Sequence, residues 1–380
     1  MTAQESHHLA AIGPVPGYSV ALAHDWLTAY AGSERVVREL LRIYPAAPLL
    51  TTLVRRDVMP AELAAAKPSL LQRLPGAVSH HEWMLPLMPL AWRLRHPIDT
   101  VQAVISSSHA CAKAVRTAVG IPHLCYCHTP MRYAWDFAAE QARFPRAVRP
   151  LAKAMMAGFR RWDRATAAGV TRFVANSRAV ATRIERFYGR PAEVVAPPVR
   201  TGFFTPGPVE PGPDFLYVGR LVGYKRADLA VEAFAELPYR LLVVGEGHLG
   251  PALRKRATPN VTFLGSVDDT TLRSLFRQSR AMVFPAEEDF GIAMAEAQAC
   301  GTPVVSVDRG GARDIVQPGR TGWLARPGDV ADLRRAIRRA AVEELDRTAI
   351  REHAESFSAE RFRERIRHSI EEMLRDPTPR

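Results

Sequence analysis

Four charged side chains in the second half of the sequence have the types and spacing of a site for phosphates and hydroxyls. Arg220 and Lys225 lie in VGRLVGYKRADLAVEAF, and Glu288 and Glu296 lie in FPAEEDFGIAMAEAQACGTPVVS. Basic side chains bind the oxygens of a diphosphate, and a carboxylate accepts hydrogen bonds from paired sugar hydroxyls. Together they have the chemistry to hold a nucleotide-sugar.

The residues around the two glutamates predict a ligand site at the end of a strand. AMVFPA is expected to be a buried strand and residues 292–300 a short helix, with Gly291 allowing close approach of the backbone to a ligand. Ligands of open parallel sheets bind beyond the carboxyl ends of the strands, where a helix N-terminus suits pyrophosphate. We expect Glu288 to hold sugar hydroxyls and Glu296 the ribose. The spacing alone would also fit two solvated glutamates on a surface helix.

The two basic residues are placed in the same way. Arg220 follows the strand DFLYVG, and Lys225 lies near the start of the next helix. Both are expected to reach the diphosphate and to stabilise the negative charge that builds on it as it departs. Gly310 and Gly311, after the strand PVVSV, are weaker candidates for lining the same pocket.

Strands and helical stretches alternate in both halves of the chain, which predicts an α/β protein with two parallel sheets. Residues 18–197 and 214–356 are the expected domains, joined by a linker over 198–213 that is rich in proline and glycine. Residues 1–17 are predicted to be a disordered lead-in. Residues 357–380 are predicted to form a helix, with Ser358 as its N-cap, and a short tail. In the stretch SVDDTT, Asp269 is the expected cap of another helix.

The composition is that of a soluble globular protein, with 47% hydrophobic and 24% charged residues among 380. No apolar run is long enough to span a bilayer, and the N-terminus lacks the pattern of a secretory signal. The four cysteines, Cys111, Cys125, Cys127 and Cys300, form neither a secreted disulfide framework nor a zinc-binding pattern. We therefore expect a cytoplasmic protein with buried thiols.

The formal net charge of +12 suits nucleic acid, an anionic membrane or phosphorylated substrates. Residues 143–164 predict a basic amphipathic helix that would fit the inner face of a membrane, although a helix packed on the core explains the pattern as well. The apolar stretch HHEWMLPLMPLAWRLRH would meet a lipid-linked acceptor or else be buried core. A nucleic-acid-binding protein would need a reading helix or an aromatic platform, and no such motif is recognisable.

The sequence resembles the retaining glycosyltransferases of family 4, which have the GT-B fold. The Arg-x4-Lys and Glu-x7-Glu motifs match, and ALAHDWLTAYAGSERVV resembles the family's first strand and glycine-rich loop. YCHTPMRYAWD resembles a segment of the bacterial O-antigen and exopolysaccharide mannosyltransferases of that family. The match covers residues 18–375. It implies two Rossmann-like domains facing a cleft, with the C-terminal helix crossing back to the N-terminal domain.

The resemblance implies roles at matching positions. Gly32 would contact the diphosphate and the acceptor, and His128 would touch the donor sugar or assist the acceptor. The remaining positions bind the donor: Arg220 and Lys225 the diphosphate, Glu288 and the backbone N–H groups of Phe290, Gly291 and Ile292 the sugar, and Glu296 the ribose. The chain departs from the family at Ala31, where a second glycine is common, and at Asp314, where glutamate is common.

The activity that the resemblance implies is transfer of a hexose, with retention, from a nucleotide-sugar to a glycan, lipid-linked or other glycoconjugate acceptor. GDP-mannose is the preferred donor. We expect no metal and no cofactor beyond this co-substrate, and the leaving phosphate should take the proton of the acceptor. The alternatives are a UDP-sugar-dependent transferase, an epimerase of the same fold that needs no acceptor, a binding module without catalysis, and a basic nucleic-acid-binding protein.

Overall fold

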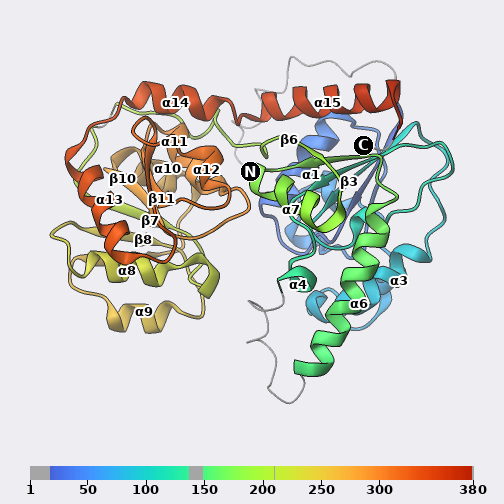
Figure 1. Cartoon of the computed structure of the whole chain (residues 1–380), viewed down its shortest axis with the longest axis horizontal. Helices are drawn as coiled ribbons and strands as arrows, with labels where there is room; N and C mark the ends of the chain where they lie inside the picture. The colour runs from blue at the N-terminus through green and yellow to red at the C-terminus, as the bar shows by residue number, and fades with distance from the viewer. Residues whose placement is uncertain (1–17, 137–148, 209, 379–380) are drawn as a thin grey trace. The chain divides into compact units, whose positions relative to one another are not determined.

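The computed structural model describes residues 18–136, 149–208 and 210–378, which form two compact units (Figure 1). The first unit takes the described chain up to Val174, together with Phe187–Pro191 and the C-terminal residues from Ile366. The second takes Ala175–Arg186 and Ala192–Arg365. The predicted lead-in over 1–17 lies outside the described residues. Each unit is built around one six-stranded sheet.

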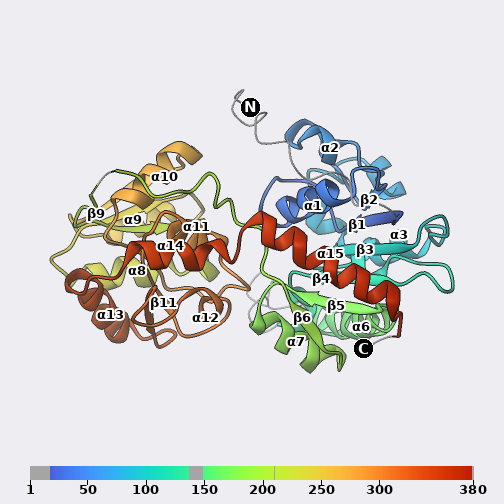
Figure 2. The same ribbon diagram turned by 90° about the horizontal axis from the view of Figure 1, so that it is seen from above.

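The first sheet has the strand order β2-β1-β3-β4-β5-β6 (Figure 2). Strands β1, β3 and β4 are buried along their whole length and pair in parallel, so they read as continuous runs of apolar and small residues. The strands are β1 (Val20–His24), β2 (Leu49–Thr51), β3 (Ala103–Ser108), β4 (His123–Cys127), β5 (Arg172–Ala175) and β6 (Ala192–Val194).

The helices of this part of the chain follow the predicted alternation with the strands. Helix α1 has a strongly apolar face because Val36, Val37, Leu40 and Ile43 share one side, and all four are buried. The helices are α1 (Gly32–Ile43), η2 (Arg56–Val58), α2 (Ala61–Ala64), η3 (Leu70–Arg73), η4 (His81–Leu87), α3 (Met88–Arg93), η5 (Ala112–Ala114), α4 (Arg132–Trp135), α6 (Arg149–Ala167) and α7 (Arg178–Tyr188).

The second sheet has the strand order β12-β11-β10-β7-β8-β9, again in parallel register. Its strands are β7 (Phe215–Val218), β8 (Leu241–Val244), β9 (Val261–Gly265), β10 (Ala281–Phe284), β11 (Val304–Val307) and β12 (Gly322–Ala325). Its helices are η8 (Gly223–Lys225), α8 (Ala227–Phe234), α9 (Gly250–Arg256), α10 (Asp269–Gln278), α11 (Ile292–Ala299), α12 (Ala312–Ile315), α13 (Val330–Val342), α14 (Arg347–Glu355) and α15 (Ala359–Arg375).

Both sheets reverse their strand order at one point. In the first sheet β1 lies between β2 and β3, and in the second β7 lies between β8 and β10. The connections therefore leave in opposite directions on either side of the β1/β3 and β7/β10 pairs. Such switch points open a crevice at the carboxyl ends of the strands, where ligands of parallel α/β sheets bind. The fold thus positions one candidate site in each unit.

The predicted linker packs against the second unit for part of its length. Val199 and Phe204 are buried in the core of that unit, and the Val199 N–H donates to the Phe357 carbonyl at 2.9 Å. Apolar anchors on a proline-rich segment were not visible in its composition. The domain limits at 198–213 and 357 remain predictions.

The C-terminal helix α15 begins as predicted, because the Ser358 hydroxyl accepts the Arg361 N–H at 3.3 Å. Its second half belongs to the first unit, where Glu372 pairs with Arg172 at 2.6 Å. The cap of α10 differs from the prediction. Asp268 accepts the Thr271 N–H at 2.7 Å, and Asp269 is the first residue inside the helix.

The predicted basic helix is observed as α6 over Arg149–Ala167, and its remaining residues, 143–148, lie outside the described chain. Its inner side packs in the same apolar cluster as Met88 and Trp92 of α3. No helix among the described residues is both long enough and apolar enough to cross a membrane. All four cysteines are free and buried, as predicted.

Candidate functional site

The two predicted diphosphate-binding residues follow β7, at the switch point of the second sheet. Arg220 is exposed and donates to the Tyr224 hydroxyl. Lys225 ends the short helix η8, two residues before α8 begins. The ammonium nitrogen of Lys225 lies 2.5 Å from Oε1 of Glu288, which follows the neighbouring strand β10. The structure therefore brings together Lys225 and Glu288, which are far apart in the sequence.

The loop that carries Glu288 is held by a glycine pair. The Gly311 N–H donates to the Glu288 carbonyl at 2.8 Å. A Cβ atom on Gly310 would lie 2.4 Å from that carbonyl oxygen, and one on Gly311 would lie 2.3 Å from the Phe290 carbonyl oxygen. Only glycine allows so close an approach. The two glycines thus fix the backbone behind Glu288 rather than merely lining a pocket.

Helix α11 begins directly after this loop with its N-terminus open to a ligand. Its N-cap is Gly291, which has φ +103° and offers no side-chain cap. The first N–H groups of a helix have no partner within the helix and carry partial positive charge. Phe290, next to the cap, is buried and packs edge-on against Phe357. The loop therefore leaves the first N–H groups of α11 without a side-chain cap, which suits an anion.

Glu296 lies on α11 but in surroundings that the sequence did not predict. Its side chain is buried, and Oε1 lies 3.2 Å from Nε of Arg200. Arg200 also binds both carboxylate oxygens of Asp269, at 2.5 and 2.9 Å. Burial alone would lower the pKa of Arg200, but the two carboxylates outweigh it and raise that pKa. Arg200 was missed because a single arginine in a proline-rich stretch carries no signal of its partner.

Two further glycines position the Arg220 loop. A Cβ atom on Gly245 would lie 2.0 Å from the Gly219 carbonyl oxygen, and one on Gly247 would lie 2.3 Å from the Leu221 carbonyl oxygen. The loop after β8 therefore packs its backbone directly against the loop after β7. The Gly-x-Gly pattern after the strand RLLVVGEG was the available signal.

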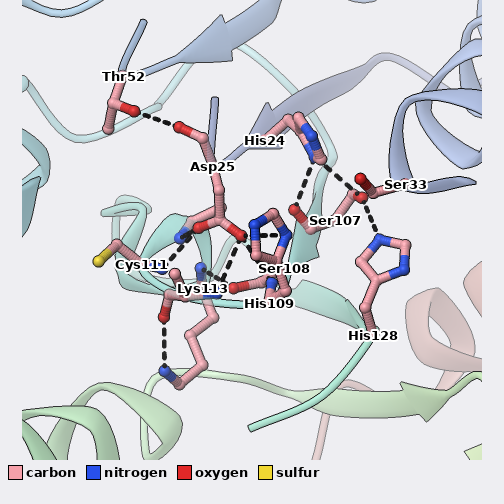
Figure 3. A network of polar contacts seen from close by, with 12 residues as sticks. His24, Asp25, Ser33, Thr52, Ser107, Ser108, His109, Cys111, Lys113 and His128 are labelled. Carbon is pink, nitrogen blue, oxygen red and sulfur yellow. Dashed lines mark hydrogen bonds and ion pairs between the residues drawn. The ribbon is translucent and has the colours of Figure 1, made fainter. Parts of the chain in front are cut away.

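His128 follows β4 in the first unit, where it belongs to a polar network (Figure 3). Its Nε2 atom lies 2.8 Å from the hydroxyl of Ser107 on β3. Nδ1 of His24, the last residue of β1, lies 3.0 Å from the Ser107 carbonyl oxygen and 3.1 Å from the same hydroxyl. Burial, together with the nearby His109 and His24, lowers the pKa of His128 to about 3. The ring is therefore neutral at physiological pH.

Asp25 anchors the loop that follows β3. Its carboxylate is fully buried and accepts four backbone N–H groups, those of residues 109–112, at 2.5–3.0 Å. Nδ1 of His109 lies 3.1 Å from the same carboxylate. Burial alone would raise the pKa of Asp25, but His109, His24 and the N–H donors outweigh it and lower that pKa. Asp25 is thus a buried anion whose partners are all fixed.

Gly32 is the first residue of α1, whose N-terminus is already occupied by a carboxylate of its own. Glu34 accepts the Ala31 N–H and the Ser33 hydroxyl, both at 3.0 Å, and lies 3.6 Å from Nε2 of His24. Sequence reasoning singled out Gly32 and His128 in this half but missed the buried acids and histidines around them. The available signal for these residues was that HDW (residues 24–26) and SSSH (residues 106–109) both lie at the ends of expected strands.

Within the described residues, no three His, Cys, Asp or Glu side chains are grouped as a metal site would need. The second unit offers cations, an open helix N-terminus and a carboxylate, which together can hold a charged diphosphate and the hydroxyls of a sugar. The first unit offers the neutral His128 ring together with acids that are paired inside the unit, which suits hydrogen bonding to an uncharged ligand.

Two family models match the chain and together span most of it. Residues 30–203 match the model described as Glycosyltransferase Family 4, and residues 200–357 match the model described as Glycosyl transferases group 1. The first match contains the His128 network, and the second contains Arg220, Lys225, Glu288 and Glu296.

Curated relatives carry several different activities. The chain is 33% identical over 242 residues to a D-inositol 3-phosphate glycosyltransferase of Gordonia bronchialis, a match that covers 53% of this chain and 51% of that protein. It is 34% identical over 158 residues to the D-rhamnosyltransferase WbpZ of Pseudomonas aeruginosa, covering 38% and 42%. The chain thus spans about half the length of the curated relatives it matches. The mannosyltransferase branch remains a prediction.

Solved structures match over nearly the full length of the chain. HepE of Anabaena, determined in complex with UDP and glucose, has a TM-score of 0.70 at 17% identity and covers 93% of this chain and 100% of its own. A sucrose-phosphate synthase of Thermosynechococcus elongatus has a TM-score of 0.71 at 18% identity, covering 94% and 99%. These identities establish the fold alone. The two family models match successive parts of the chain, which is therefore similar to family 4 glycosyltransferases over most of its length and has the GT-B fold.

Proposed function

We propose that this protein transfers a hexosyl group from a nucleoside diphosphate sugar to a hydroxyl of its acceptor, with retention of anomeric configuration. The observation that carries the proposal is the meeting of Lys225 and Glu288 at the β7/β10 switch point, beside the open N-terminus of α11. Both side chains of this 2.5 Å ion pair are partly exposed, so each can bind a ligand once the pair separates. A donor would exchange it for Lys225 on the diphosphate and Glu288 on the sugar hydroxyls.

The charges of this site favour departure of the diphosphate. Negative charge grows on the leaving group as the glycosidic bond breaks, and Arg220, Lys225 and the α11 N–H groups stabilise it more than the ground state. Glu296 is proposed to bind the ribose from a position fixed by Arg200. Arg200 holds Glu296 in place before the donor binds, whereas Lys225 and Glu288 separate from each other to bind it.

The proton of the acceptor is proposed to pass to the leaving phosphate. A double displacement would need a free carboxylate at the anomeric carbon. Asp25 and Glu34 of the first unit are poor candidates, because both are buried and bound to backbone N–H groups and histidines. Retention then follows from attack on the face that the diphosphate leaves.

GDP-mannose is the proposed donor, and this choice rests on the resemblance of residues 126–136 to bacterial mannosyltransferases. The alternative is a UDP-sugar, since HepE was determined with UDP and glucose. The test is a panel of GDP- and UDP-sugars incubated with and without glycan and lipid-linked acceptors, in buffer containing EDTA. We expect acceptor-dependent release of GDP from GDP-mannose. Conversion of the donor without any acceptor would instead indicate an epimerase, and activity abolished by EDTA would contradict the metal-independent reaction.

A lipid-linked acceptor is proposed because the first unit exposes a set of apolar side chains. Along η4 and α3, Trp83, Leu90 and Leu94 have 79%, 51% and 64% of their surface exposed, and Leu151 of α6 has 74%. Exposed Arg93 lies within the same helical stretch. Apolar residues flanked by arginine suit the anionic inner leaflet of a membrane. Membrane contact would then involve the 81–94 segment as well as the predicted 143–164 helix.

The membrane contact is tested by flotation with vesicles of phosphatidylglycerol and phosphatidylcholine, compared with phosphatidylcholine alone. We expect binding only to the anionic vesicles. The triple variant Trp83→Ser, Leu90→Ser, Leu94→Ser should lose it. Val342→Ser is the matched control, because Val342 is 76% exposed but belongs to the second unit. Equal flotation of the triple variant and the wild type would reject this surface.

A further inference from the structure

We infer that Ser107 fixes the single ring proton of His128 on Nδ1, and that His24, held by Glu34, fixes the orientation of Ser107. His128 is then a hydrogen-bond donor toward substrate, and Ser107, His24 and Glu34 are positioning residues. The inference deepens the proposed function, since the substrate in question is the sugar or acceptor of that reaction. It rests on a chain of contacts across three adjacent strands, β1, β3 and β4 (Figure 3).

The first step is the proton on His24. Its Nδ1 atom lies 3.0 Å from the backbone carbonyl oxygen of Ser107, which can only accept a hydrogen bond. Nδ1 of His24 must therefore carry a proton, whether the ring is neutral or charged. The same N–H points to the Ser107 hydroxyl oxygen at 3.1 Å. The parallel register that pairs His24 with Ser107 fixes this geometry in the backbone.

The second step is the direction of the Ser107 hydroxyl. A hydroxyl has one proton to give, and its oxygen already faces the N–H of His24. The proton is then donated to the other close partner, Nε2 of His128, at 2.8 Å. Since the His128 ring is neutral, an accepting Nε2 places the ring proton on Nδ1. Figure 3 shows the Ser107 hydroxyl between the two imidazole rings.

The third step is what holds His24 in place. The ring is fully buried, and its second nitrogen lies 3.6 Å from the Glu34 carboxylate. Glu34 is held in turn by the Ala31 N–H and the Ser33 hydroxyl at the start of α1. The separation from Glu34 is longer than a hydrogen bond, so Glu34 acts on His24 through its charge, and the bond to the Ser107 carbonyl oxygen orients the ring. Of the two imidazoles in this series, His24 is fully buried and His128 is partly exposed.

The chemical consequence is a choice between two roles for His128. With its proton on Nδ1 and Nε2 already accepting from Ser107, the ring has no lone pair available to take a proton from the acceptor. It can donate a hydrogen bond to an oxygen of the transferred sugar or the acceptor. This favours recognition of a hydroxyl or ring oxygen over general base catalysis, and it agrees with a leaving phosphate that receives the proton.

The chain supplies a matched control for this relay. Ser106, one residue earlier on β3, faces the other side of the sheet, and its hydroxyl lies 2.7 Å from Nε2 of the buried His123 on β4. Ser106→Ala therefore removes the same kind of serine–histidine hydrogen bond from the same two strands without touching His128. A purely structural effect of losing such a bond should be similar in both variants.

The test combines nitrogen-15 NMR of histidine-labelled full-length protein with steady-state kinetics. Comparison with the spectrum of His128→Gln assigns the His128 signals. We expect the Nδ1–H tautomer at pH 7.5 in the wild type, and in Ser107→Ala a mixture or the Nε2–H tautomer. Turnover of Ser107→Ala should fall about 10- to 100-fold, as for loss of other groups that orient a site ligand, with the KM of the donor nearly unchanged. Ser106→Ala should change neither the His128 tautomer nor turnover. Ser107→Thr should restore the Nδ1–H tautomer.

An Nε2–H tautomer in the wild-type protein would overturn the inference directly, without any variant. So would an unchanged His128 tautomer in folded Ser107→Ala. The NMR result does not depend on activity. Absence of sugar transfer with a confirmed Nδ1–H tautomer would therefore reject the proposed function and leave the relay standing.

Discussion

The β1/β3 and β7/β10 switch points are equivalent positions in their sheets, but they carry opposite kinds of side chain. At β7/β10 the groups are charged and reachable, with Arg220 exposed and Lys225 paired only to Glu288 among the ion pairs observed in the described residues. At β1/β3 the groups are histidines, serines and acids whose charges are satisfied by neighbours inside the same unit. The same topology therefore groups reachable charged side chains at one switch point and internally paired polar side chains at the other.

The helices that begin at these two points show how the difference arises. Helix α1 carries Glu34 in its first turn, and that carboxylate folds back onto the N-terminus. Helix α11 has no acidic residue in its first turn and no side-chain cap. An incoming phosphate would meet a neutralised helix end in the first unit and an open one in the second. Glu34 therefore accounts for the different charge at the two helix ends.

The largest effect should come from the charged site. Glu288→Ala is expected to lower kcat about 10²- to 10³-fold, as for other groups that contact the reacting sugar. The affinity for the free nucleoside diphosphate should stay nearly unchanged, because Glu288 is assigned to the sugar. Turnover and calorimetric titration with nucleoside diphosphate measure the two quantities. Glu287→Ala, which removes the adjacent, partly exposed carboxylate that pairs with Arg183 and Arg309, is the control. Near-normal turnover in Glu288→Ala would remove Glu288 from the site.

A substitution of Asp25 at the β1/β3 switch point should be seen first as a loss of stability. Asp25→Asn replaces one carboxylate oxygen by an NH₂ group, so two of the four backbone N–H donors would face another donor. The expected loss is about 2–3 kcal/mol in the stability of the first unit, the cost of buried hydrogen-bonding groups left unpaired. Hydrogen exchange of the β1 and β3 amides measures it. Asp228→Asn, which removes a charge from a partly exposed pair with Arg226, should change little.

The effect of Asp25→Asn on stability should depend on pH in acid, with a definite sign. The folded-state pKa of Asp25 is lowered, so its contribution is present above the unfolded value of about 3.9 and is lost as pH falls through the folded pKa. The stability difference between wild type and Asp25→Asn should therefore shrink below about pH 4. A difference that persists in acid would mean that the carboxylate charge is not what holds the 109–112 loop.

A smaller effect separates the two glutamates of the charged site. Glu296→Ala is expected to raise the Kd for nucleoside diphosphate about tenfold, as for loss of one hydrogen bond to a charged group. Asp269→Ala is the matched control, because Asp269 shares the guanidinium of Arg200 but lies more exposed. Titration calorimetry on both variants tests the assignment. Equal affinities in Glu296→Ala and wild type would exclude Glu296 from ribose binding.

The meeting of residues at the β7/β10 switch point could be predicted from the sequence more fully than that at β1/β3, and the reason is physical. Arg220 and Glu288 each follow a recognisable apolar strand, and carboxyl ends of parallel strands meet at one edge. The two contacts of the Ser107 hydroxyl, by contrast, depend on which strands are neighbours and in what register. Ser107 reaches His24 and His128 only because β3 lies between β1 and β4. No local pattern encodes that order.

Short elements and long-range pairs were missed for similar reasons. Strand β2 has three residues and β12 begins with glycine, so neither has a clear strand pattern. The pairing of Arg200 with Glu296 joins a proline-rich stretch to a helix almost a hundred residues later. The sequence analysis did not single out Gly245 and Gly247, because their need for glycine comes from the Gly219 and Leu221 carbonyls of another loop.

The smallest expected effect is a pH dependence that belongs to the neutral site alone. Burial would lower the pKa of His24, but the carboxylates of Glu34 and Asp25 and the Ser107 carbonyl outweigh it and raise that pKa. Burial would raise the pKa of Glu34, but His24 outweighs it and lowers that pKa. The His24 contribution is complete below about pH 6.5 and is lost as pH rises through the folded pKa. The Glu34 contribution is complete above about pH 4.3 and is lost in acid.

Glu34→Gln should therefore destabilise the first unit most between these two values, by about 1–2 kcal/mol for a buried hydrogen-bonded charge. The penalty should be smaller at pH 8.5 than at pH 5.5, because His24 is then neutral in the wild type as well. Glu39→Gln is the control, since Glu39 is also buried on α1 but pairs with Arg42 at 2.5 Å, which does not titrate in this range. Hydrogen exchange of the α1 and β1 amides at the two pH values measures both variants. Parallel losses in Glu34→Gln and Glu39→Gln would show that His24 carries no charge at pH 5.5, and the contrast between the two switch points would then rest on neutral hydrogen bonds alone.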